Sequence, residues 1–393
     1  MRIGIDARPL SKRRTGIGNY IQGLVGLLPV VAPQHDYFLY SNRRIDTVLP
    51  KGRVCGHVDG AFRWCPGSFW IVGRGAHMAR RDALDVYWAT DPILPVRMPP
   101  SVLKVVTVYD MVWLRCPETT TRYNLMVQTL CARKAITDAD YVIVISQSTQ
   151  DELIQTLRVP REKTRVVYPG VAKRYRVQKP EQAAEYISRK YGVPLRYMAF
   201  AGTVEPRKNL KLLVKVLGIL KSSKRLDCPL VVAGASGWKD SPLFRDIQAA
   251  GLTSADLRFL GYIPDEDMPL FYAGAQVFLF PSIYEGFGLP PIEAMACGAP
   301  VIASDSPCMP EVLGDAAILE PITNPERFAS AILRVLADDQ LRRVLREKGI
   351  QRSQSFAYET SVKQLLEIFT LPCRLTPAQL GQSRDVVELR VRT

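Results

Sequence analysis

The chain has 393 residues, of which 47% are apolar and 23% are charged. This length and this ordinary globular mixture predict two folded domains and exclude a low-complexity protein. The 52 Lys and Arg against 38 Asp and Glu give a net charge of +14. Such a basic chain favours anionic partners, namely phosphorylated substrates or anionic lipid. Because no recognisable nucleic-acid-binding module appears, nucleic acid is not expected as a partner.

Cysteine and histidine usage gives no sign of a metal centre. The eight cysteines contain no Cys-x-x-Cys pair, and there are only three histidines, so we expect no zinc site. Asp6 interrupts the apolar run that a signal peptide would need, and no run approaches the roughly 18 apolar residues of a membrane span. We therefore expect a cytoplasmic protein that at most touches the inner face of the cytoplasmic membrane.

In chain order, the first half alternates short apolar runs with longer helical patterns, which predicts parallel strands flanked by helices. The expected strands are Ile3–Asp6, Tyr37–Tyr40, Val86–Ala89, Lys104–Tyr109 and Tyr141–Ser146. The expected helices are Gly18–Leu28, Thr121–Ala135 and Ser148–Leu157. The last of these begins with a capping signature at Ser148.

The alternation restarts after a basic helical connector at Glu181–Tyr191. The expected strands here are Tyr197–Ala201, Pro229–Ala233, Leu257–Leu260, Val277–Pro281 and Val301–Ala303, and the expected helices are Leu210–Leu220 and Pro290–Cys297. The fold class is therefore α/β, with two Rossmann-like doubly wound domains over residues 1–172 and 190–371. Because open α/β sheets bind ligands at the carboxyl ends of their strands, we expect a ligand in the cleft between the domains.

The strongest chemical signal is a glycine-rich loop between two glutamates, Glu285-Gly-Phe-Gly-Leu-Pro-Pro-Ile-Glu293. Glycines before a helix start let main-chain N–H groups approach an anion, and the helix dipole favours a diphosphate there. Glu285 lies in the loop and Glu293 in the helix, so the two carboxylates reach different parts of one ligand and suit vicinal hydroxyls. Taken singly, either glutamate could instead be a solvated loop acid or a helix-start acid.

A second signal places two cations after a predicted strand and just before a helix, in Gly202-Thr-Val-Glu-Pro-Arg207-Lys208-Asn. An arginine fork suits phosphate oxygens and a lysine supplies a point charge. Cations at a helix start oppose the dipole preference, which favours an anionic ligand over a merely solvated pair.

Two weaker patterns carry less information. Gly16-Ile-Gly18 resembles a phosphate-cradling turn, but Ile21 stands where the dinucleotide fingerprint needs its third glycine. Asp138-Ala-Asp140 and Asp265-Glu-Asp267 match the short Asp-x-Asp pattern of metal-using transferases. Such a short match occurs freely by chance, so we interpret both as structural and predict no required metal.

An aromatic segment with arginines nearby contains Trp64, Phe69 and Trp70. Exposed aromatics beside basic residues suit the interface of an anionic membrane that carries a lipid-linked acceptor. The alternative is an ordinary aromatic cluster buried under a loop.

Together these segments resemble the retaining two-domain glycosyltransferases of family 4 (group 1), which have the GT-B fold and include bacterial mannosyltransferases of O-antigen, capsule and exopolysaccharide. The resemblance spans almost the whole chain. The Glu-x7-Glu segment and Glu-Pro-Arg-Lys-Asn are specific, whereas the Gly-x-Gly turn is not. Ala139–Ser146, Tyr168–Val171 and Pro310-Glu-Val312 also fit. In this family the final helix returns to the N-terminal domain, so residues 372–393 are expected to pack there.

The resemblance implies roles residue by residue. Catalytic roles fall on Arg207, Lys208, Glu285 and Asp110; donor binding falls on Gly16, Gly18, Gly202, Thr203, Phe287, Gly288, Leu289 and Glu293. Glu285 would hold the donor hexose, Glu293 the ribose, and the two cations the diphosphate. No cofactor is required, because the nucleotide sugar (GDP-mannose first, UDP-hexoses next) is a substrate.

Two departures from the family pattern bear on these roles. Thr203 stands where many relatives have an arginine, and Tyr109 stands where many have a histidine before Asp110. Tyr109 could replace a hydrogen bond to the hexose, so it joins the acceptor-side candidates. Three alternative functions stay open: a non-catalytic nucleotide-sugar-binding paralogue, a GT-B sugar-nucleotide epimerase and a phosphorylase that would use free phosphate.

Overall fold

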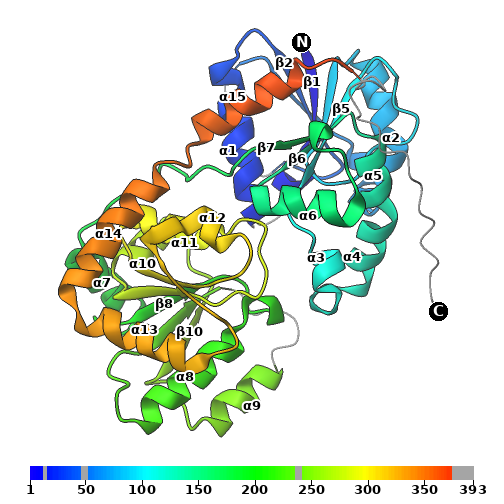
Figure 1. The fold of residues 1–393 in the computed structure, drawn as a ribbon. Coiled ribbons are helices and arrows are strands. Elements are labelled where there is room, and N and C mark those ends of the chain that lie inside the picture. The colour runs from blue at the N-terminus through cyan, green and yellow to red at the C-terminus, as the bar shows by residue number, and fades with distance from the viewer. Residues whose placement is uncertain (12–15, 46–51, 235–240, 374–393) are drawn as a thin grey trace, which may run out of the picture.

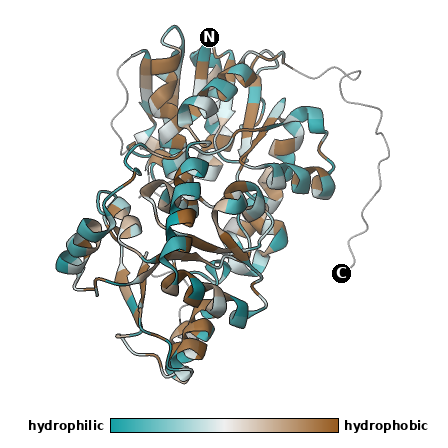
Figure 2. Cartoon of the chain, turned by 60° about the vertical axis from the view of Figure 1, so that its left-hand side comes forward, coloured by the Kyte–Doolittle hydropathy of each residue, from teal (hydrophilic) through white to brown (hydrophobic). Residues whose placement is uncertain are grey.

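The computed structural model describes residues 1–11, 16–45, 52–234 and 241–373. Over these residues the chain forms two α/β domains, each built around one parallel sheet (Figure 1). Figure 2 shows hydrophobic strands inside both domains and hydrophilic stretches on the helices around them. The predicted fold class is therefore confirmed.

The N-terminal sheet has the strand order β3-β2-β1-β4-β5-β6-β7. Its strands are β1 Arg2–Asp6, β2 Asp36–Ser41, β3 Val54–Val58, β4 Val86–Ala89, β5 Leu103–Val108, β6 Tyr141–Val144 and β7 Thr164–Val166. Its helices are α1 Gly16–Val31, α2 Gly67–Arg81, α3 Val112–Arg115, α4 Arg122–Val127, a π-helical turn Gln128–Ala132, α5 Arg133–Asp138 and α6 Gln147–Leu157. Short 3-10 turns at Arg8–Ser11 and Gly60–Phe62 follow β1 and β3.

The C-terminal sheet has the order β10-β9-β8-β11-β12-β13. Its strands are β8 Met198–Ala201, β9 Leu230–Ala233, β10 Leu257–Gly261, β11 Val277–Phe280, β12 Val301–Ser304 and β13 Ile318–Glu320. The predicted helical connector is α7 Pro180–Tyr191. The helices that follow it are α8 Leu210–Ser222, α9 Ser241–Ala249, α10 Met268–Ala273, α11 Leu289–Cys297, α12 Met309–Leu313, α13 Pro325–Ala337, α14 Asp339–Ser353 and α15 Tyr358–Phe369.

The sequence missed the strands β3, β7 and β13 and several helices, α2 among them, and it placed the start of α6 too late. The α6 cap is Ser146, whose hydroxyl accepts a hydrogen bond from the Thr149 amide at 3.0 Å. Ser148 lies inside the first turn, because the cap must precede the residues whose N–H groups are unsatisfied. The missed α2 contains three glycines, Gly67, Gly73 and Gly75, which weaken its helical signal.

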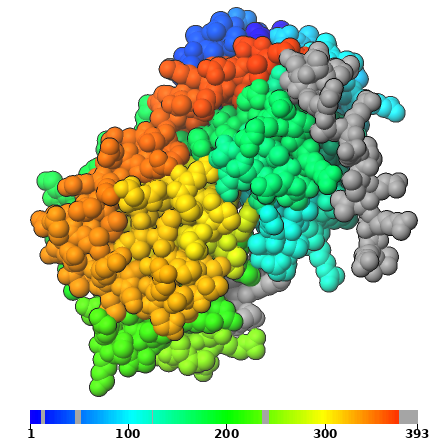
Figure 3. Space-filling model, viewed as in Figure 1, coloured from blue at the N-terminus to red at the C-terminus, as the bar shows by residue number. Residues whose placement is uncertain are grey.

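The chain crosses back to the N-terminal domain at α15, earlier than residue 372. Tyr358 occupies the space beside Gly23 of α1, where a Cβ would lie 2.3 Å from its ring, and Phe369 packs on Trp88 with ring centroids 6.0 Å apart. The C-terminal domain therefore ends before α15 rather than at 371. Residues 374–393 lie outside the described part of the chain. Figure 3 shows the orange C-terminal helices running from one domain onto the other.

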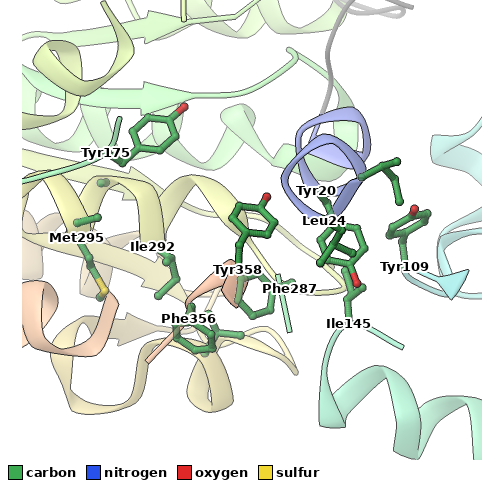
Figure 4. Close-up of a cluster of buried hydrophobic side chains, with 14 of the residues drawn as sticks. Tyr20, Leu24, Tyr109, Ile145, Tyr175, Phe287, Ile292, Met295, Phe356 and Tyr358 are labelled. Atoms are coloured by element: carbon green, nitrogen blue, oxygen red, sulfur yellow. The ribbon is translucent and has the colours of Figure 1, made fainter. Parts of the chain in front are cut away.

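A continuous apolar cluster joins the two domains behind the cleft. Figure 4 shows Tyr20 and Tyr109 of the N-terminal domain in line with Tyr358, Phe287 and Ile292. Because this cluster is made of large side chains with little exposure, it supports the contact between the domains through apolar burial. The loops that face the cleft are therefore held close to one another.

Candidate active site

The C-terminal sheet reverses its strand order between β8 and β11, its central pair. Loops leaving two such strands turn to opposite sides, which opens a crevice at their carboxyl ends. The loop after β8 contains Gly202 through Lys208, and the loop after β11 contains Pro281 through Gly288. The two strongest sequence signals therefore meet at one topological switch point.

Glu285 lies between two cations in this crevice. Its Oε1 is 2.6 Å from Nζ of Lys208, and its Oε2 is 2.8 Å from Nη1 of Arg207. Arg207 also binds Glu205 at 2.7 Å. Burial alone would raise the pKa of Glu285, but Lys208 and Arg207 together lower that pKa to about 2. The Glu285 carboxylate is therefore ionised at neutral pH. Of its two cations, only Arg207 also pairs with Glu205.

Main-chain geometry fixes the loop that carries the cations. Asn209 has a left-handed φ of 54°, which ends the 3-10 turn Pro206–Lys208 and starts α8. Its side-chain amide donates to the Pro281 carbonyl at 3.2 Å, and the Ile283 amide donates to the Arg207 carbonyl at 2.9 Å. These bonds tie the β8 loop to the β11 loop and hold the cations beside Glu285.

Glu293 is in a different chemical environment on α11. Its side chain is buried, and the Tyr272 hydroxyl donates to it at 3.2 Å. Burial raises the pKa of Glu293 to about 7, although Arg174 and the hydrogen bond from Tyr272 work in the opposite direction. The two glutamates of the motif therefore differ in charge state near neutral pH, one fixed as a carboxylate and one poised to titrate.

The N-terminal domain meets this site through Tyr109 and Asp110, which follow β5. A Cβ built on Gly286 would lie 1.8 Å from the Tyr109 carbonyl oxygen, so only glycine fits there. Burial raises the pKa of Asp110, and the nearby Arg207 opposes that shift. The structure thus brings Asp110 close enough to interact electrostatically with Arg207 and Glu285, although the sequence separates them by more than ninety residues.

A second contact between the domains is made by Glu311 of α12. Its two carboxylate oxygens accept hydrogen bonds from the main-chain amides of Gln147 and Ser148 at 2.7 and 2.8 Å. The Tyr168 hydroxyl donates to the same carboxylate at 2.9 Å. The carboxylate therefore satisfies free N–H groups at the start of α6, where the helix dipole favours a negative charge. We did not predict this contact, because the Pro310-Glu-Val312 match does not indicate which helix start lies opposite.

Tyr284 makes a third contact that sequence reasoning missed. Its hydroxyl accepts from the Met111 amide at 2.8 Å and donates to Glu152 at 2.5 Å. The position directly before Glu285 thus binds two elements of the N-terminal domain. Only the folded arrangement reveals this, because a tyrosine in a loop has no distinctive pattern.

The other predicted donor residues lie around the same cleft. Gly16 begins α1, and a Cβ there would lie 3.8 Å from Leu289, the first residue of α11. Gly288 has a φ of +91° and caps α11. Phe287 points into the interdomain cluster, with its ring centroid 5.2 Å from that of Phe356. Only its main chain is therefore available at the cleft.

The remaining predicted donor-binding residues are Gly202, Thr203 and Gly18. Gly202 has a φ of +148° beside Lys208, whose Cε would lie 3.8 Å from a Cβ at that position. Thr203 is exposed next to it. Gly18 is buried in the first turn of α1, where a Cβ would lie 3.4 Å from the Pro9 carbonyl, so its role in the structure is close backbone packing.

Two predictions on the acceptor side are wrong. The Tyr109 side chain points into the core, where its hydroxyl donates to the Thr90 carbonyl at 2.6 Å, because a buried hydroxyl needs a partner. Only its carbonyl reaches the cleft. Trp70 is 2% exposed within α2, and its Nε1 donates to Asp59 at 3.1 Å. It therefore cannot touch a membrane, whereas Trp64 and Phe69 are exposed.

The two Asp-x-Asp patterns have structural partners. Asp267 binds Lys190 at 2.6 Å and accepts from Tyr186 at 2.9 Å, while Asp140 accepts from the Lys104 amide at 2.7 Å. Within residues 1–11, 16–45, 52–234 and 241–373, no group of three or more His, Cys, Asp or Glu is placed to hold a metal ion. A search of the same residues finds no helix long and apolar enough to cross a bilayer.

Solved structures first define the class of protein. The crystal structure of Anabaena Alr3699/HepE in complex with UDP-glucose superposes with a TM-score of 0.72 at 20% identity, covering 93% of this chain and 98% of that one. Two parallel sheets facing a cleft, with this likeness, define a GT-B fold.

The sequence comparisons then give the family. Residues 30–174 match Glycosyltransferase Family 4, and residues 187–352 match Glycosyl transferases group 1. This chain belongs to the group 1 glycosyltransferases of family 4 and is an enzyme of that class. The O-antigen chain mannosyltransferase B of Escherichia coli is 27% identical over 384 residues, which covers 94% of this chain and all of the relative. The serotype-specific mannosyltransferase WbdA of Escherichia coli is 28% identical over 265 residues, 65% of this chain but only 32% of that longer protein.

Proposed function

We propose that this glycosyltransferase moves a hexose from a nucleotide diphosphate sugar to a saccharide acceptor during assembly of a surface polysaccharide. Mannose from GDP-mannose is the first choice of donor, since both Escherichia coli relatives are named mannosyltransferases; a UDP-hexose is the second. The observation that carries the proposal is the Lys208–Glu285–Arg207 cluster at the switch point of the C-terminal sheet, opposite Asp110.

The donor would exchange partners with this cluster. A diphosphate brings two negative charges, which Arg207 and Lys208 can bind as a fork and a point charge. As these cations bind the phosphates, they neutralise less of the negative charge on Glu285. The Glu285 carboxylate then becomes a stronger hydrogen-bond acceptor for hexose hydroxyls. Glu293 would accept from the ribose hydroxyls one to two helical turns away. Main-chain groups of Phe287, Gly288 and Leu289, with Gly202 and Gly16, would surround the remainder of the donor.

The reaction would proceed with retention of configuration. The acceptor oxygen forms a bond to the anomeric carbon on the face from which the diphosphate oxygen departs, and the acceptor proton passes to that leaving phosphate. No side-chain base is needed for this transfer. Fixed cations stabilise the charge that develops on the diphosphate, and positioning supplies much of the remaining rate. We propose that no metal ion is required and that the enzyme works on the cytoplasmic side of the membrane.

A donor panel tests the proposal. GDP-mannose, GDP-fucose, UDP-glucose, UDP-galactose and UDP-N-acetylglucosamine are compared by thermal shift and by slow donor hydrolysis, with and without EDTA. We expect one donor to raise Tm, and hydrolysis to persist in EDTA. Lys208→Ala should lower turnover by about 10²–10³-fold, as removal of one transition-state donor does in other enzymes.

The matched control is Lys211→Ala, because Lys211 lies three residues further on, in the first turn of α8, has an exposed side chain and pairs with Asp246 at 3.2 Å. This variant should keep wild-type turnover. Near-normal turnover of Lys208→Ala would remove Lys208 from the mechanism. No response to any donor would contradict the proposed donor class, and activity that disappears in EDTA would contradict the metal-free chemistry.

A further inference from the structure

Tyr284 belongs to the C-terminal domain by sequence but packs inside the N-terminal domain. It lies in the loop between β11 and α11, directly before Glu285. Its side chain is 7% exposed and joins an apolar cluster whose other described members lie between Phe38 and Val166, within the N-terminal domain. Because the ring can leave this cluster only by exposing its surface to water, it holds the loop against the N-terminal domain.

The Tyr284 hydroxyl makes two hydrogen bonds to the N-terminal domain. It accepts from the Met111 amide at 2.8 Å and donates to Oε2 of Glu152 at 2.5 Å. Glu152 lies in α6 with a side chain 10% exposed, and its other carboxylate oxygen pairs with Arg115. Burial, and then the bond to Glu152, raise the pKa of Tyr284, so the phenol keeps the proton that it donates. Hydrogen bonds to a charged partner are the stronger ones, so this contact favours one position of the ring.

The main chain of the same residue contacts the donor cluster. The Tyr284 carbonyl accepts a hydrogen bond from Nη1 of Arg207 at 2.9 Å, and the same nitrogen lies 2.8 Å from Oε2 of Glu285. A shift of the main chain at Tyr284 would therefore move an acceptor of Arg207 and the attachment point of Glu285 together. Reaction rates are sensitive to small displacements of groups that position a substrate.

Helix α6 also holds the residue on the other side of Glu285. The Thr149 hydroxyl donates to the Gly286 carbonyl at 3.4 Å. Thr149 and Glu152 are three residues apart in α6, so they lie on one face of the helix. One helix of the N-terminal domain thus contacts the loop immediately before and immediately after Glu285.

We infer that Tyr284 and Glu152 are positioning residues for the proposed glycosyl transfer. Through them the N-terminal domain holds the main chain before Glu285, and so sets where Glu285 and Arg207 stand when the donor is bound. In this arrangement neither positioning side chain touches the donor. The inference rests on the proposed function and adds the residues through which the contact between the domains acts on the donor cluster.

The first experiment separates positioning from stability by kinetics, with hydrolysis of GDP-mannose or of the donor that the panel selects. Tyr284→Phe keeps the ring and removes both hydrogen bonds of the hydroxyl. We expect kcat to fall at least about tenfold, because one of these bonds has a charged partner. The Kd for the donor should stay within about threefold, since the lost contacts are not made to the donor. Glu152→Gln keeps an oxygen that can accept from Tyr284, so it should retain more activity than Glu152→Ala.

The matched control is Tyr197→Phe in the C-terminal domain. Tyr197 is buried, and its hydroxyl donates to the Phe271 carbonyl at 2.8 Å. It directly precedes β8, at the end of that strand opposite to the cleft. Loss of this hydroxyl should lower Tm through the lost hydrogen bond, while kcat stays within about twofold of wild type. Wild-type kcat in Tyr284→Phe, or an equal loss of kcat in both variants, overturns the inference.

A double-mutant cycle tests whether the two positioning residues act through one bond. Tyr284→Phe combined with Glu152→Ala should lower kcat no more than about threefold beyond Tyr284→Phe alone, because the bond that joins them is already absent. If the two losses multiply instead, the residues act separately and the inference is overturned.

Hydrogen exchange gives a readout that needs no donor. The amides of Gln147 and Ser148 are covered by Glu311 and not by Tyr284. In Tyr284→Phe they should exchange at least about tenfold faster, because the contact between the domains opens more often. Faster exchange confined to the Met111 amide would show a purely local role and overturn the inference. Failure of the proposed function is distinct, because then no donor raises Tm in wild type, whereas the exchange result is unaffected.

Discussion

The two switch points of this molecule differ in how their chemistry is encoded. At the C-terminal one, the charged residues come from two short continuous segments, Glu205–Asn209 and Pro281–Gly288. At the N-terminal one, between β1 and β4, a pocket of about 400 Å³ is lined by groups of one to three residues from the segments after β1, β2 and β4 and from helices α1, α2 and α4. A compact motif suits a ligand of fixed chemistry, such as a nucleotide diphosphate. The residues that line the N-terminal pocket follow no such local pattern, so only the folded arrangement shows that they lie together.

The sites also differ in their electrostatics. The donor side holds the Glu285 carboxylate between two nearly buried cations, and Glu205 on Arg207 brings the net charge of the four side chains to zero. The N-terminal pocket buries one balanced pair, Arg8 with Asp6, and exposed apolar and basic side chains lie near it. The first arrangement is suited to charge that changes during a reaction. The second combines one buried ion pair with apolar side chains that are exposed to water. Three predictions separate these roles.

The largest expected effect comes from disturbing the contact between the two domains at Gly286. Gly286→Ala places a methyl group where the Tyr109 carbonyl lies, 1.8 Å from the new Cβ, so the β11 loop or the N-terminal domain must shift. Because a misplacement of about 1 Å can lower a rate about a hundredfold, we expect kcat to fall by about that factor. Donor binding should change less, since Arg207 and Lys208 lie on the other loop, after β8. Steady-state kinetics and donor thermal shift measure the two effects.

The matched control for this prediction is Gly26→Ala in α1, where a Cβ meets nothing within 4 Å. It should keep wild-type kcat and gain a little stability from the better helix former. If Gly286→Ala retains wild-type kcat, the closed contact between Tyr109 and Gly286 is not the reactive arrangement.

The donor-side residues could be predicted because they lie in two short continuous segments of the sequence. Prediction failed where the environment of a residue depends on segments that are distant in the sequence. Glu285, Glu293, Arg207 and Lys208 were identified from spacing and a family resemblance, and the structure brings Glu285 together with both cations. Tyr109 and Trp70 were misplaced, because which face of a strand or helix is buried depends on neighbours distant in sequence. Glu311 and Tyr284 bind across the cleft to residues more than 130 positions away, a relation that no local pattern encodes.

A smaller effect should appear in the pH dependence of donor binding, to which Glu293 contributes and Glu285 does not. The pKa of Glu293 is raised to about 7, so this group is increasingly protonated in the free enzyme as the pH falls from 8 to 6. Ribose hydroxyls donate to the ionised Glu293 carboxylate, so the donor should bind preferentially to the deprotonated enzyme. The Kd for the donor should therefore fall as the pH rises. One proton linked to binding gives roughly a tenfold change in Kd over this range. Glu285, with a pKa of about 2, contributes nothing to it.

Isothermal titration with GDP-mannose, or with the donor that the panel selects, measures this slope. Glu293→Gln should bind more weakly at pH 8 and show a flat profile, because the amide does not titrate. A slope that persists in Glu293→Gln would assign the pH dependence to another group and would detach Glu293 from the ribose.

The smallest expected effect tests whether Tyr109 belongs to either site. Its hydroxyl donates to the Thr90 carbonyl at 2.6 Å inside the core, and the carbonyl that reaches Gly286 is main chain. Tyr109→Phe therefore removes one buried hydrogen bond and should lower the free energy of unfolding by about 1 kcal/mol, measured by urea denaturation. KM for the donor should stay within about twofold, because the ring and the carbonyl keep their places. A large rise in that KM with unchanged stability would return the hydroxyl to the hexose. The expected pattern, a loss of stability alone, would instead make Tyr109 a structural link between the end of β4 at Thr90 and the loop of Glu285.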